Sequence, residues 1–142
     1  MDWLRKLLRL EKPAPPRVML SDDVVHFSAD GTAPVSMTIG DLAAVVIETN
    51  DSGPWGDDVV WHLLGRADGS ALSVPQSAEN FSPLLVRLQS LPGFDNEAVI
   101  EAMGSTALNA FLCWETDEAV RPDSNLLAFA RFGRSKRKES AP

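Results

Sequence analysis

The sequence has little of three features on which common protein chemistries depend. Cys113 is the only cysteine among 142 residues, which excludes an internal disulfide and a cysteine-based zinc site within one chain. No apolar run approaches the ~20 residues that a membrane-spanning helix needs. The first ten residues mix arginine and lysine with leucine, whereas a secretory signal needs an unbroken apolar stretch. We therefore expect a cytoplasmic protein.

Basic residues are scarce in the middle of the chain. Residues 18–130 contain only Arg66, Arg87 and Arg121 against seventeen acidic residues, a net charge of −14. Residues 1–17 carry +3 and residues 131–142 carry +4, which gives −7 for the whole chain. An acidic body repels phosphate groups, so we exclude a nucleic-acid duplex as a partner. Attraction to an anionic partner, such as an anionic membrane surface, would have to come from the two basic ends.

We expect the chain to divide into four parts. We predict an amphipathic basic helix over residues 1–12 and a proline-rich linker over residues 13–16. A single globular α+β domain is expected over residues 17–116, and a basic, partly disordered tail over residues 117–142. The apolar side of the predicted N-terminal helix comprises Trp3, Leu4, Leu7 and Leu8, and its basic side Arg5, Lys6 and Arg9.

Short extended runs separated by tight turns dominate residues 17–76. The segment around Val35, Met37 and Ile39 alternates apolar and polar residues, as a half-buried strand does. Turn signals such as Asp30-Gly31 separate these runs, and together they predict an antiparallel meander sheet of five or six strands.

The pattern becomes helical after Gln76. We expect two helices packed on the sheet, near residues 82–91 and 95–103, and a last strand over residues 110–114. Ser82 is the expected N-cap of the first helix, with Pro83 at its first helical position, and Asp95 the expected N-cap of the second. The predicted core comprises Val45, Ile47, Trp61, Leu85, Leu88, Val99, Ile100 and Phe111, and Met103 is expected to share the buried stripe of the second helix.

The residue patterns that mark catalytic or metal sites are weak. The sequence has no glycine-rich phosphate loop and no dinucleotide fingerprint, and His26 and His62 do not form a zinc motif. His62 is expected to be a hydrogen-bonded core or rim residue, and Cys113 an inert buried thiol. We therefore predict a protein that is not an enzyme, with no catalytic residue, metal, cofactor or small-molecule substrate.

Five segments resemble a family of small uncharacterised bacterial cytosolic proteins. The similarity covers about residues 17–116, and its most specific strings are Leu-Pro-Gly-Phe-Asp-Asn-Glu and Phe-Leu-Cys-Trp. The resemblance implies no activity and no catalytic residues. A meander followed by a helix also looks, more loosely, like the pleckstrin-homology-like fold. The five segments are residues 49–55, 58–61, 74–76, 88–97 and 111–115.

Three functions are consistent with these features. The first is a non-enzymatic, adaptor-type protein-interaction module, whose N-terminal helix and loop residues Trp55, Asp57 and Asp58 contact a partner protein or a second copy. The second is a peripheral membrane or lipid-binding module that uses the basic ends. The third is a small acidic inhibitor or immunity-type protein that covers a basic site. The N-terminal helix would dock on its own domain, on a second copy or on a membrane, because a helix of about ten residues is marginal alone in water.

Overall fold

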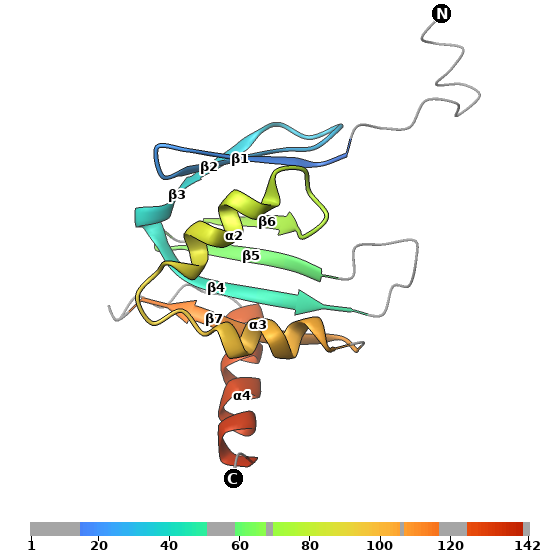
Figure 1. The fold of residues 1–142 in the computed structure, drawn as a ribbon, viewed down its shortest axis with the longest axis vertical. Helices are drawn as coiled ribbons and strands as arrows, with labels where there is room; N and C mark the ends of the chain where they lie inside the picture. The colour runs from blue at the N-terminus through green and yellow to red at the C-terminus, as the bar shows by residue number, and fades with distance from the viewer. Residues whose placement is uncertain (1–14, 51–58, 68–69, 106, 117–124, 141–142) are drawn as a thin grey trace, which may run out of the picture.

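The computed structural model shows an α+β protein with two antiparallel sheets (Figure 1). It describes residues 15–50, 59–67, 70–105, 107–116 and 125–140, with side chains up to Arg134 in the last range. The first sheet has the order β1-β2-β3, and the second has the order β6-β5-β4-β7. The strands of the first sheet are β1 (Arg17–Ser21), β2 (Val24–Ser28) and β3 (Val35–Thr38). Those of the second are β4 (Leu42–Thr49), β5 (Val59–Gly65), β6 (Ala71–Pro75) and β7 (Asn109–Glu115).

The prediction of one meander of five or six strands is therefore wrong, although the α+β class is confirmed. The meander breaks between β3 and β4, where the short 3-10 helix η1 (Ile39–Asp41) turns the chain. The Ile39 N–H donates to the carbonyl of Asp23 at 2.8 Å, which ties this turn to the first sheet. β4 then pairs with β5 on one edge and with β7 on the other, and so becomes a central strand.

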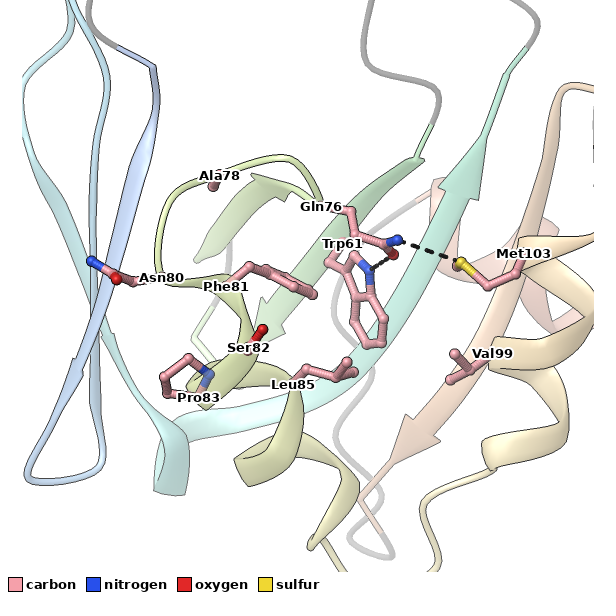
Figure 2. Close-up of a pocket in the computed structure, with 10 residues that line it drawn as sticks. All are labelled: Trp61, Gln76, Ala78, Asn80, Phe81, Ser82, Pro83, Leu85, Val99 and Met103. Atoms are coloured by element: carbon pink, nitrogen blue, oxygen red, sulfur yellow. Dashed lines mark hydrogen bonds between the residues drawn. The ribbon is translucent and has the colours of Figure 1, made fainter.

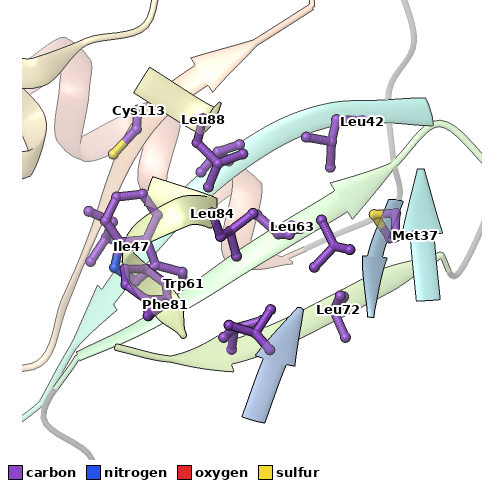
Figure 3. Close-up of a cluster of buried hydrophobic side chains, with 14 of the residues drawn as sticks. Met37, Leu42, Ile47, Trp61, Leu63, Leu72, Phe81, Leu84, Leu88 and Cys113 are labelled. Carbon is purple, nitrogen blue, oxygen red and sulfur yellow. The ribbon is translucent and has the colours of Figure 1, made fainter. Parts of the chain in front are cut away.

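The larger core lies between the two sheets and two helices, α2 (Phe81–Gln89) and α3 (Asn96–Met103) (Figure 3). Val45, Ile47 and Trp61 project from the four-stranded sheet into this core. Leu84 and Leu88 reach it from α2, and all five side chains are fully buried. Of the predicted core residues, Val45, Ile47, Trp61, Leu88 and Phe111 are buried, and Leu85 and Val99 are half-buried at its edge.

A third helix, α4 (Asn125–Ser140), covers part of the opposite face of the four-stranded sheet. Leu127 and Ala130 pack there against Val46 and Leu112 of β4 and β7. Arg131 adds an ion pair with Glu115 at the end of β7. Residues 125–140 were expected to belong to a partly disordered tail, and the buried Leu127 explains why a helix forms there.

An ion pair between Asp23 and Arg87 links the β1–β2 hairpin to α2. The two-residue turn of this hairpin consists of Asp22 and Asp23, which have φ angles of 52° and 59°. The Arg87 side chain on α2 donates to both carboxylate oxygens of Asp23, at 2.9 and 3.1 Å. These hydrogen bonds hold the pKa of Asp23 below its ordinary value of 3.8.

We predict that Asp23→Asn lowers stability in a pH-dependent way. The lowered pKa means that the Asp23 carboxylate stabilises the fold above about pH 3.8, and that this stabilisation is lost as the pH falls through the folded-state pKa. The urea midpoint of the variant should therefore lie below that of the wild type at neutral pH and converge with it in acid. Asp22→Asn, in the same turn, is the control and should show no such convergence. A difference that persists in acid would assign the effect to turn geometry.

Candidate functional site

A groove opens between α2 and α3 above the four-stranded sheet, as Figure 2 shows. Its volume is about 620 Å³, within the ~300–1,000 Å³ typical of binding pockets. The residues that line it carry hydroxyl, amide and thioether groups but no ionisable side chain. The groove is therefore suited to apolar groups rather than to acid–base chemistry. Its lining comprises Trp61, Gln76, Ala78, Asn80, Phe81, Ser82, Pro83, Leu85, Val99 and Met103.

The floor of the groove is held by a short chain of side-chain contacts. The indole Nε1 of Trp61 donates to Oε1 of Gln76 at 2.9 Å, and Nε2 of Gln76 lies 3.5 Å from the sulfur of Met103. The rings of Trp61 and Phe81 are tilted by 58° with their centroids 5.4 Å apart. Because strand β5, the turn after β6 and both helices contribute to this chain, the floor is preorganised before any partner arrives.

The N-terminus of α2 lies at one end of the groove. Asn80 precedes the helix with a φ of 64°, and its side chain makes no capping hydrogen bond. Phe81 is the first helical residue, so the prediction of Ser82 as N-cap with Pro83 at the first helical position is wrong. The left-handed conformation of Asn80, which asparagine tolerates well, starts the helix earlier and places Phe81 against Trp61.

α3 packs on the sheet through its small residues. Ala98 and Ala102 are buried on its inner side, and Asp95 caps the helix, as predicted, by accepting from the Ala98 N–H at 3.1 Å. Val99 and Met103 therefore face the groove, and Met103 is 44% exposed. The predictions that Ile100 is a core residue and that Met103 shares the buried stripe are wrong, since Ile100 is 71% exposed and Met103 is also an exposed residue. Alanines let the helix approach the sheet closely and leave the larger apolar residues for the groove and the surface.

The domain that carries the groove is acidic as a whole, with a net charge of −14 over residues 18–130. On α3, Glu97 and Glu101 are exposed, but each is two residues from Val99, so they project from the side of the helix opposite the groove. The two helices contain one basic residue, Arg87, and Asp23 binds it. The net charge of the domain therefore favours a positively charged partner over an acidic one.

Three polar side chains form a row across the face of the four-stranded sheet that lies away from α2 and α3. His62 on β5 lies between Ser73 on β6 and Glu48 on β4. Its Nδ1 atom is 2.8 Å from the Oγ atom of Ser73, and its Nε2 atom is 3.1 Å from the Oε1 atom of Glu48. Serine, histidine and carboxylate in a line are the groups that a nucleophilic serine requires. None of the three lines the α2–α3 groove or the smaller cavity beside β2 and β3. We therefore assign them a structural role, in which both ring nitrogens of His62 are satisfied.

The site residues predicted from the sequence all lie outside the described residues. They are Trp3, Leu4, Arg5, Lys6, Leu7, Leu8, Arg9, Trp55, Asp57 and Asp58. Hydrophobic periodicity does not mark the groove as a site, because it predicts that Val99 and Met103 are buried core residues, whereas both line the groove. The signal that identifies them is the pair Ala98 and Ala102, whose spacing marks the face of closest packing.

The comparisons with known proteins leave the site to be interpreted from its own geometry. No family model, curated protein or solved structure matches this chain. The family resemblance and the pleckstrin-homology-like fold stay predictions. Within the described residues, no helix is long and apolar enough to span a bilayer, and no group of three or more histidine, cysteine or acidic side chains is placed to hold a metal ion.

Proposed function

We propose that this chain is a non-enzymatic, adaptor-type protein-interaction module that holds an amphipathic helix of a partner in the α2–α3 groove. The observation that carries the proposal is the groove itself, which lies between two helices and has a mainly apolar lining and an aromatic floor. Helix-in-groove recognition uses a hydrophobic channel of this kind, into which an amphipathic helix lays its apolar face. The groove also lacks the ionisable side chains that catalysis by the protein would require.

Charge defines the polar side of the partner helix. Residues 18–130 carry a net charge of −14, and Arg87, the one basic residue of α2 and α3, is paired with Asp23. A partner helix with lysine or arginine on its polar side would gain favourable long-range attraction, whereas an acidic helix would be repelled. The expected partner is therefore an apolar and basic helix.

A model peptide tests this function directly. The probe is a fluorescein-labelled amphipathic peptide of leucine and lysine, titrated into the full chain and followed by fluorescence anisotropy. Met103→Lys places a charge in the groove wall at a partly exposed position, so the fold should tolerate it. We expect the variant to bind the probe at least about tenfold more weakly, which corresponds to about 1.4 kcal/mol.

The matched control is Val86→Lys, which makes the same change on α2 outside the groove. Val86→Lys should bind the peptide probe with the affinity of the wild type, and circular dichroism should show that both variants are folded. Equal weakening by the two variants would overturn the groove as the site and indicate binding by the acidic surface alone, as in the inhibitor-type alternative. Binding of the full chain to anionic vesicles, with no binding of the probe, would instead favour the peripheral-membrane alternative.

A further inference from the structure

We propose that the α2–α3 groove is occupied, in the absence of a partner, by residues 2–10 of the same chain. This inference rests on the proposed function of the groove and names its first ligand. The segment would act as a built-in competitor that a partner helix must displace. Three observations lead to this proposal. They are the place where the N-terminal segment joins the domain, the lengths of the linker and the predicted helix, and the agreement between the side chains of the segment and those of the groove.

The chain enters the domain at the end of the groove. The carbonyl of Pro16 accepts from the Glu79 N–H at 2.9 Å, and the Glu79 carbonyl accepts from the Val18 N–H at 3.0 Å. The Arg17 and Glu79 side chains form an ion pair at 3.2 Å. Glu79 stands between Ala78 and Asn80, which both line the groove. The residues that precede Pro16 therefore start beside the mouth of the groove.

The lengths fit a segment that folds back. Residues 11–16 span at most ~19 Å as a proline-rich extended linker. A helix over residues 2–10 is about 14 Å long, which is close to the length of α2 with its nine residues. The linker can thus carry the helix along the groove between α2 and α3 without strain.

The side chains also match. The predicted apolar side of this helix consists of Trp3, Leu4, Leu7 and Leu8, and its other side carries Arg5, Lys6 and Arg9. The first set suits the apolar side chains that line the groove, and the second is attracted to the acidic domain, which carries −14 over residues 18–130. A helix this short is marginal alone in water, so packing in the groove supplies the stabilisation that it lacks.

The double variant Leu4→Ser/Leu7→Ser of the full chain tests this inference. It removes two apolar contacts without changing the charge. We expect the methyl resonance of Met103 to shift relative to the wild type, because the docked segment no longer covers it. We also expect the leucine–lysine probe to bind the variant about tenfold more tightly, because no segment has to be displaced. Leu4→Met/Leu7→Met, which keeps both contacts apolar, should behave as the wild type.

The remaining outcomes separate this inference from the proposed function. An unchanged Met103 resonance and unchanged probe affinity would overturn the docking of residues 2–10. The groove function would still stand if Met103→Lys weakened the probe. A dimeric mass in light scattering for the wild type but not for the double variant would overturn docking within one chain, since the segment would then occupy a second copy. Failure of the probe to bind either chain would count against the proposed function itself.

Discussion

Replacing Trp61 with alanine is expected to cost about 3–5 kcal/mol of the free energy of unfolding. The side chain is fully buried at the centre of the larger core and contacts the Phe81 ring. Its loss leaves a cavity beneath the groove and a Gln76 side chain without its indole partner. Since small domains are stable by only about 5–15 kcal/mol, the variant should unfold at much lower urea concentration. Urea titration followed by far-ultraviolet circular dichroism measures the change.

Trp61→Phe is the matched control. Phenylalanine keeps an aromatic ring in the core but removes the N–H that donates to Gln76 at 2.9 Å. One hydrogen bond of this kind contributes about 1 kcal/mol, and the smaller ring adds a modest cavity. The phenylalanine variant should therefore retain most of the stability. Similar losses for the two variants would show that the hydrogen bond, rather than the buried ring, dominates at this position.

Replacing Leu127 with alanine is expected to cost about 2–5 kcal/mol if α4 folds as one unit with the sheet. Leu127 is 1% exposed and packs against the face of the four-stranded sheet that α2 and α3 do not cover. The small cluster around it holds few large side chains, so much of the apolar packing of α4 on the sheet depends on Leu127. In the Leu127→Ala variant, backbone amide hydrogens should exchange faster in α4 than in β5.

Phe129→Ala is the control for this experiment. Phe129 lies two residues farther along the same helix and is 50% exposed, so its removal should change stability by no more than about 0.5 kcal/mol. If Leu127→Ala and Phe129→Ala had the same small effect, α4 would not contribute to the stability of the domain. Urea titration of both variants distinguishes these outcomes.

Local signals in the sequence predicted much of the secondary structure. The alternation around Met37 and the β-branched run Val45, Val46 and Ile47 mark β3 and β4. Asp95 starts α3 as expected, because the cap depends only on residues close to it in sequence. The pairing of strands was harder to predict. The partner of β4 on its second edge is β7, about sixty residues later, and no local pattern encodes that contact.

The candidate site was less predictable than the fold. Periodicity showed that Val99, Ile100 and Met103 share one side of a helix, but not how α3 would rotate on the sheet. Ala98 and Ala102 decide that rotation, because burying two alanines permits closer packing than burying the larger side chains would. Hydrophobicity alone therefore could not separate a core residue from one that lines a groove.

The position of β4 between β5 and β7 also bears on how the chain is synthesised. β4 and β5 are joined by a short connection and can pair as soon as both have left the ribosome, whereas β7 is made only after α2 and α3. Until then the second edge of β4, a strand buried over most of its length, stays open to pairing with other chains. Slow translation between Thr49 and Asn109 would thus prolong the interval in which nascent chains aggregate, and a chaperone that binds apolar strands would act during that interval.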